Sequence, residues 1–65
     1  MNNAPFIKLH SNKIEILINI QQINYVAQYY DNKASIYLNY REAPLYIDEP
    51  YQEVKKKIEY IAGVV

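Results

Sequence analysis

The sequence predicts a small α+β domain: an antiparallel β-meander of about five short strands that carries one C-terminal amphipathic helix on one face. Three observations support this prediction. Short segments of alternating apolar and polar residues recur through residues 6–47. Polar groups that suit tight turns separate these segments. The last part of the chain instead places apolar residues three and four positions apart, which is the spacing of one helix face.

The first two strands are expected to form a hairpin. Residues 6–10 alternate in character and end at Ser11-Asn12-Lys13, a polar group that favours a tight turn. The second strand, residues 14–18, has isoleucine at every second position, and Glu15 and Leu17 lie on the opposite face. We expect the isoleucine face to point into the core, with Ile14, Ile16 and Ile18 as its members.

A short helical turn is expected between the second and third strands. Asn19 can cap this turn, and Ile20 and Ile23 lie three positions apart, as on one helical turn. The third strand then runs over about residues 24–30. Asp31-Asn32-Lys33 is expected to turn the chain back.

The fourth strand, residues 34–40, has the most regular alternation in the chain. Its apolar face consists of Ile36, Leu38 and Tyr40. Residues 41–44 then form a second hairpin loop. A short fifth strand, residues 45–47, follows Pro44, which lacks a backbone donor and is tolerated at the start of a strand.

The helix is expected to begin at Asp48-Glu49-Pro50. Proline fits the first turn of a helix, and acidic side chains there favour the positive end of the helix dipole. Gly63 lies where the helix would end. The apolar stripe of this helix should pack on the isoleucine faces of the strands, and it contains Tyr51, Val54, Ile58, Ile61 and Val65.

Length and composition limit the possible functions. A chain of 65 residues holds one domain, so we expect residues 1–65 to form a single domain with residues 1–4 as a frayed tail. Seven basic side chains balance seven acidic ones, so no net field attracts nucleic acid or an anionic membrane. There is no cysteine, and no apolar run approaches the roughly 18 residues of a membrane span. We therefore expect a cytoplasmic protein, and its Ile, Asn, Lys and Tyr content suggests an AT-rich bacterial or phage genome.

No group of residues indicates catalysis. His10 is the only histidine and is expected to be an exposed residue at a strand end. Asp48 and Glu49 are explained by the helix start, and residues 55–57 fan around a solvated helix face. A phosphate-binding loop needs several glycines, whereas this chain has one. The sequence predicts a protein that is not an enzyme and that holds no metal and no cofactor.

The eight tyrosines exceed what a small core needs. Several should share the sheet face away from the helix, and we predict an interaction surface made of Leu17, Tyr25, Tyr29, Tyr37 and Tyr46. A large exposed apolar area on a short chain favours self-association or binding of another protein. Two alternatives stay open. In one, the rings stack on unpaired bases of a single-stranded nucleic acid; in the other, they only stabilise the sheet as cross-strand pairs.

The order of these features resembles the small FlbD-type flagellar proteins of bacteria. The resemblance rests on the opening Ile7-Lys8-Leu9, the turn at Ser11-Asn12-Lys13, the aliphatic strand 14–19, the isoleucine-rich segment 20–26, and residues 46–54 running into the helix. The chain has other residues where that family usually has Asn-Gly turns. It is also similar to small strand-rich bacterial proteins of unknown role that carry one helix. Both resemblances imply a small α+β fold, and neither implies a functional residue.

Overall fold

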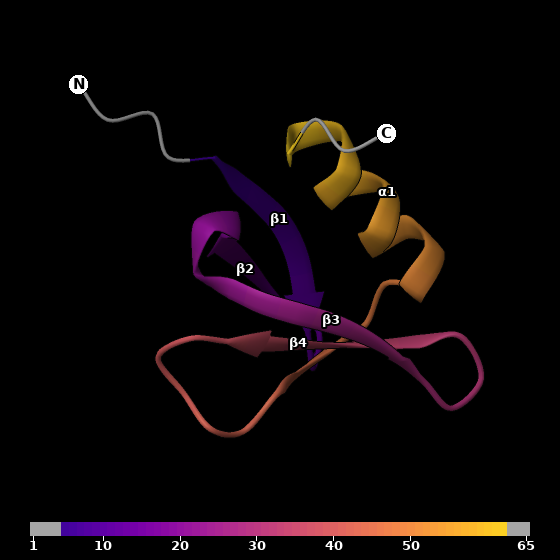
Figure 1. Ribbon diagram of the computed structural model, residues 1–65. Coiled ribbons are helices and arrows are strands. Elements are labelled where there is room, and N and C mark those ends of the chain that lie inside the picture. Colours follow the sequence, from indigo (N-terminus) through magenta and orange to yellow (C-terminus); the bar gives the residue numbers. More distant parts are fainter. Residues whose placement is uncertain (1–4, 63–65) are drawn as a thin grey trace.

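The computed structural model describes residues 5–62, so the predictions for residues 1–4, Gly63 and Val65 lie outside the described residues. Within residues 5–62 the chain forms five strands and one α-helix in the order expected (Figure 1), and this confirms the α+β class. The elements are β1 (Phe6–Ser11), β2 (Ile14–Asn19), the 3-10 helix η1 (Ile20–Gln22), β3 (Ile23–Tyr29), β4 (Lys33–Leu38), β5 (Leu45–Ile47) and α1 (Tyr51–Ala62).

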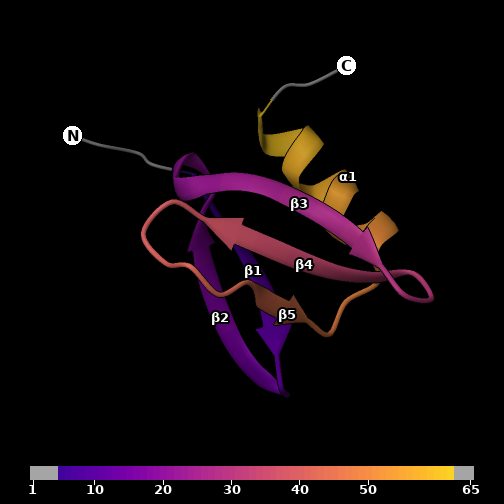
Figure 2. The ribbon, with the colours of Figure 1, turned by 60° about the horizontal axis from the view of Figure 1, so that its bottom comes forward.

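The strands form two small antiparallel sheets, which differs from the single meander that we expected. One sheet pairs β1 with β2, and the other has the order β3-β4-β5. The helical turn η1 separates them, because it ends the β2 ladder before β3 begins. Asn19 caps this turn as predicted, with its Oδ1 accepting a hydrogen bond from the Gln21 N–H at 2.9 Å. β1 and β2 run across the direction of β3 and β4 (Figure 2).

The core lies between the two sheets and beneath the helix. α1 contacts β1, β3 and β4, and its Val54 is fully buried. β4 is the central strand of its sheet and is buried along most of its length. The buried apolar side chains are Ile7, Leu9, Ile18, Ala34, Ile36, Leu38, Ile47 and Val54.

Three residues that we expected in the core are exposed instead: Ile14, Tyr40 and Ile61. Each lies at the end of an element or just beyond it. Ile14 adjoins the β1–β2 turn, where the hairpin extends beyond the core. Tyr40 follows the end of β4, because the chain turns when the Arg41 N–H bonds to the Leu38 carbonyl. The alternation of residue types therefore predicts the inward face, but it does not show where the opposing layer ends.

The β1–β2 turn is closed by two residues with positive φ, Asn12 at 54° and Lys13 at 68°. Two such residues form a type I′ turn, which matches the twist of a hairpin. The Asp48 carboxylate accepts hydrogen bonds from both turn N–H groups, at 3.1 Å from Asn12 and 2.7 Å from Lys13. The expected role of Asp48 at the helix start is thus wrong, because its side chain holds a turn that lies 35 residues away.

The helix begins at Tyr51, directly after Pro50. The Pro50 carbonyl accepts the first helical hydrogen bond, from the Val54 N–H at 3.1 Å. The Tyr51 N–H bonds to the Asn32 carbonyl at 2.9 Å, so the β3–β4 turn holds the helix start. This turn has three consecutive residues with positive φ, Tyr30 to Asn32, and so begins one residue earlier than predicted.

Candidate functional site

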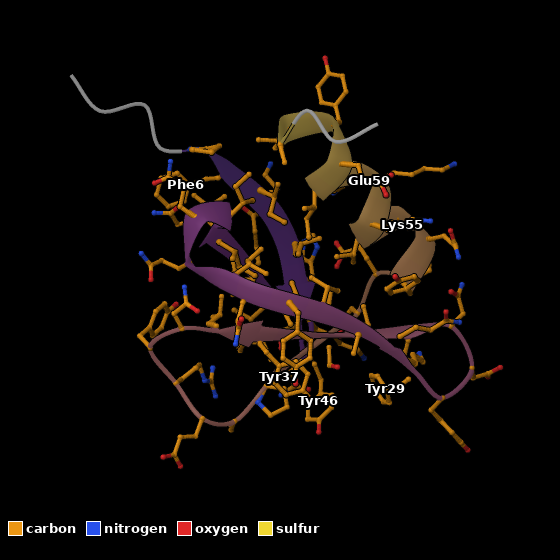
Figure 3. The ribbon with its side chains drawn as sticks, in the orientation of Figure 1. Phe6, Tyr29, Tyr37, Tyr46, Lys55 and Glu59 are labelled. Atoms are coloured by element: carbon orange, nitrogen blue, oxygen red, sulfur yellow. The ribbon has the colours of Figure 1, made fainter. Side chains whose placement is uncertain are left out.

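Four tyrosines gather on one face of the three-stranded sheet. Tyr25 and Tyr29 come from β3, Tyr37 from β4 and Tyr46 from β5. The pairing brings them together, because Tyr25 lies opposite Tyr37, and Tyr46 lies opposite Ser35. Side chains two positions apart share a face of a strand. Tyr29, Tyr37 and Tyr46 lie on the side of this sheet away from α1 (Figure 3). We call these four residues the tyrosine face.

The rings of the tyrosine face are held in two pairs. Tyr25 and Tyr37 stack with their centroids 4.3 Å apart and their planes 15° apart. Tyr29 and Tyr46 meet edge to face, at 5.3 Å and 65°. Both arrangements are favourable for aromatic rings. Tyr25 and Tyr46 remain 52% and 55% exposed, so each pair supports one ring that is open to solvent.

Small residues lie between the two ring pairs. Ala27 pairs with Ser35 at the centre of the face, and neither fills the space that a ring would take. Ser35 is buried, and its hydroxyl donates a long hydrogen bond of 3.5 Å to the Ala27 carbonyl. Because Ser35 is almost fully buried, the surrounding side chains cover the centre of the tyrosine face.

Leu17, the fifth residue of the predicted surface, does not belong to the tyrosine face. It lies on β2 in the other sheet, opposite Lys8 of β1. The prediction placed it there because it assumed one continuous sheet, in which all outward residues share a side. Leu17 is nevertheless exposed, at 64%, and it lies on an outer strand.

A groove of about 460 Å³ adjoins the tyrosine face. Tyr29 and Tyr46 form part of its wall, and it runs from there to the β1–β2 turn. Lys33 and Asp48 are its charged residues, and Asp48 is already occupied by the turn N–H groups. The lining residues are Ser11, Asn12, Tyr29, Lys33, Pro44, Leu45, Tyr46, Ile47 and Asp48.

His10 and Glu49 form a pair that the sequence did not predict. Glu49 Oε2 lies 2.7 Å from His10 Nδ1, and Glu49 Oε1 accepts a hydrogen bond from the His10 N–H at 2.9 Å. The His10 side chain is 42% exposed, whereas that of Glu49 is 14% exposed. Burial alone would raise the pKa of Glu49, but the hydrogen bonds from His10 outweigh it and hold this pKa below its ordinary value.

The geometry of the His10 and Glu49 pair explains a structural role. Its two hydrogen bonds join β1 to the segment before α1, and the Asp48 N–H adds a third, to the His10 carbonyl at 2.7 Å. No local signal could have revealed the pair, because its members lie 39 residues apart in the sequence. Within residues 5–62, no group of three or more His, Cys, Asp or Glu side chains could hold a metal ion.

The basic helix residues do not form a patch. Lys57 donates to the Lys8 carbonyl at 3.1 Å and lies 3.6 Å from Glu53, one helical turn away. Lys55 and Glu59 both point away from the sheets (Figure 3). Positive and negative side chains thus alternate over the solvated part of α1. None of the helices in the described part of the chain is long and apolar enough to cross a membrane.

No family model matches this chain, and neither a curated protein nor a solved structure shows significant similarity to it. The resemblance to FlbD-type proteins therefore stays a prediction.

Proposed function

We propose that this chain is a small non-enzymatic interaction module, which self-associates through its sheets and contacts other proteins through the tyrosine face. One observation supports this proposal most strongly. Tyr25 and Tyr46 are each more than half exposed, although both belong to ordered ring pairs on one sheet face. Exposed aromatic groups that gather on a small protein are typical of interaction sites.

The paired rings suit a binding surface for a physical reason. Binding orders side chains, and that ordering costs about 0.5–1.5 kcal/mol for each flexible group. Tyr25 and Tyr46 are already restrained by Tyr37 and Tyr29. A partner that covers these rings would therefore gain apolar contact at a reduced entropic cost.

Chain length supports the self-association in the proposal. A domain of 65 residues buries a smaller fraction of its surface on folding than a larger domain does, and it gains stability when a partner covers more of that surface. The balanced charge of the chain also imposes no long-range repulsion between copies. A cytoplasmic location, expected from the composition, is part of the same proposal.

A double variant tests the tyrosine face directly. Tyr25→Ser with Tyr46→Ser removes the two exposed rings and leaves the half-buried ones in place. A matched control, Tyr30→Ser with Tyr60→Ser, removes two rings that are 84% and 89% exposed elsewhere, in the β3–β4 turn and on α1. Peptides selected from a random display library against the native chain serve as the probe, with binding measured by biolayer interferometry.

The proposal predicts that most selected peptides bind the control variant as they bind the native chain and lose affinity for the tyrosine-face variant. Loss of two hot-spot rings should weaken binding by at least about tenfold. Peptides that bind both variants equally would refute a role for the tyrosine face. Circular dichroism of both variants checks that the fold is unchanged.

A second candidate function, binding of single-stranded nucleic acid, is favoured by one observation. The Tyr25 ring is open to solvent above a stacked partner, and Lys33 lies on the same face opposite Tyr29. Stacking on such a ring contributes roughly 1–3 kcal/mol per base. Such sites usually also carry a basic groove, and the groove beside this face contains one lysine. Flat fluorescence anisotropy of a labelled oligonucleotide at low salt would exclude this function.

A further inference from the structure

The hydrogen bonds of the β1–β2 hairpin show which backbone groups of β2 point outward. The Ile20 N–H donates to the Pro5 carbonyl at 3.1 Å, in the register that pairs Phe6 with Asn19. Hydrogen-bonded pairs alternate with non-bonded pairs along an antiparallel ladder. Every second residue of β2 therefore bonds to β1, and the others turn their N–H and carbonyl groups to the outer edge. The residues with outward groups are Glu15, Leu17 and Asn19.

The same alternation applies to β1, and three outward groups of that strand, on His10 and Lys8, are bonded to other elements. The His10 N–H donates to Glu49, and the His10 carbonyl accepts from the Asp48 N–H. Lys57 Nζ reaches the Lys8 carbonyl. On β2, in contrast, no hydrogen bond to another element within residues 5–62 reaches the outward backbone groups of Glu15 or Leu17, and the Asn19 carbonyl is used only by the adjoining turn η1, which Asn19 caps. Figure 2 shows β2 at the rim of its sheet.

An open strand edge binds another strand readily, because its N–H and carbonyl groups lack partners. We infer that β2 is the dimerisation edge and that its occupant is a second copy of this chain, paired antiparallel about a two-fold axis at Leu17. The inference rests on the self-association proposed above and names the surface that brings it about. It joins the two-stranded sheets of two copies into one four-stranded sheet.

The sequence of β2 fits this axis. An axis at Leu17 places Leu17 opposite Leu17 of the second copy and Glu15 opposite Asn19, so that a carboxylate meets an amide. All three residues with outward groups then form hydrogen-bonded pairs, and Ile16 lies opposite Ile18 on the core side. An axis at Glu15 would set two carboxylates against each other, which is destabilising. An axis at Ile16 would pair Asn19 with Lys13, in the turn beyond β2.

The outer edge of the other sheet fits a second copy less well. Its end strand β3 has an irregular register with β4 between Ile23 and Tyr25. A bulge of this kind bends a strand and opposes edge pairing. β2 instead pairs with β1 over all six of its residues without interruption. Pairing at β2 also leaves the tyrosine face free, so that a dimer would present two of them.

Single-cysteine crosslinking tests the register, because the native chain contains no cysteine. Residues of a hydrogen-bonded pair have Cα atoms about 5.5 Å apart, within the range of a disulfide. Leu17→Cys should therefore crosslink to itself under mild oxidation. In Glu15→Cys the two thiols would be four residues out of register, roughly 13 Å apart along the strands, and should crosslink about tenfold less. A mixture of Glu15→Cys and Asn19→Cys should form the mixed disulfide.

A charge variant tests the same axis without oxidation. Leu17→Lys sets two ammonium groups opposite each other and should convert the dimer to a monomer in light scattering. Ile14→Lys is the matched control, because Ile14 is 63% exposed, as Leu17 is 64% exposed, but lies three residues from the axis. The control should keep the native mass.

The possible outcomes separate this inference from the proposed function. Selective crosslinking of Leu17→Cys together with a monomeric Leu17→Lys supports the inference. A dimer that persists in Leu17→Lys, with no crosslinking preference between Leu17→Cys and Glu15→Cys, refutes the β2 edge and leaves self-association standing. A native chain that stays monomeric at every concentration refutes both.

Discussion

Glu49→Ala removes the carboxylate that joins β1 to the segment before α1. That carboxylate accepts hydrogen bonds from the His10 N–H at 2.9 Å and from His10 Nδ1 at 2.7 Å. A hydrogen bond to a charged group contributes about 1.5–3 kcal/mol. The side chain of His10 is 42% exposed, so solvent screening reduces the contribution of the hydrogen bond between its ring and Glu49. We expect the free energy of unfolding at pH 7 to fall by about 2–3 kcal/mol, and Tm by roughly 10–20 °C in a domain of this size.

The pH dependence gives this prediction a second readout. The pKa of Glu49 lies below its ordinary value in the folded chain, so its contribution is complete above the pKa of the unfolded chain. This contribution is lost as pH falls through the folded pKa. The difference between the native chain and Glu49→Ala should thus be largest at neutral pH and shrink below about pH 4.

Urea unfolding followed by circular dichroism at pH 7 and pH 3 measures both effects. Glu49→Gln is the matched control, because it keeps the size of the side chain and one acceptor but carries no charge. At pH 7, Glu49→Gln should lower the free energy of unfolding by less than Glu49→Ala does. A free energy of unfolding for Glu49→Ala within about 0.5 kcal/mol of the native value at pH 7, the range of ordinary surface substitutions, would show that this carboxylate does not stabilise the fold.

Three other substitutions test the fold. Ile58→Asp buries a charge against the core and should lower the free energy of unfolding by at least about 3 kcal/mol in a thermal melt. Ile61→Asp, at the exposed end of α1, should lower it by less than about 1 kcal/mol. Equal losses in the two variants would mean that the other face of α1 packs on the core. Asp48→Ala removes the acceptor for the turn N–H groups of Asn12 and Lys13, so their amide hydrogen exchange should accelerate, and unchanged exchange would contradict that role. Lys13→Gly, at φ 68°, should raise the free energy of unfolding by up to about 1 kcal/mol in urea, and a loss of stability would contradict the turn geometry.

Local signals predicted the individual elements well. The alternation of residue types predicted the strand β4, and the polar residues Asn12 and Lys13 predicted the first turn. Both features depend only on neighbouring residues. Asn19 capped its turn for the same reason. The division into two sheets was not predictable in this way. It depends on which strands lie side by side, and no local pattern encodes that.

The candidate site was predictable in part, for a related reason. Tyr25, Tyr37 and Tyr46 lie on consecutive strands joined by hairpins, so period-two patterning placed them on one face. Leu17 was misplaced because the prediction assumed a continuous sheet. Glu49 was assigned to the helix start because an acidic residue before a proline gives the same local signal whether it caps a helix or reaches a distant strand.

Light scattering of the native chain across a dilution series measures its solution mass and so tests self-association. We expect a dimer at high concentration that dissociates to the 7.7 kDa monomer on dilution. A monomer mass at every concentration, including the highest that can be reached, would contradict self-association and leave the tyrosine face as a surface for other proteins alone.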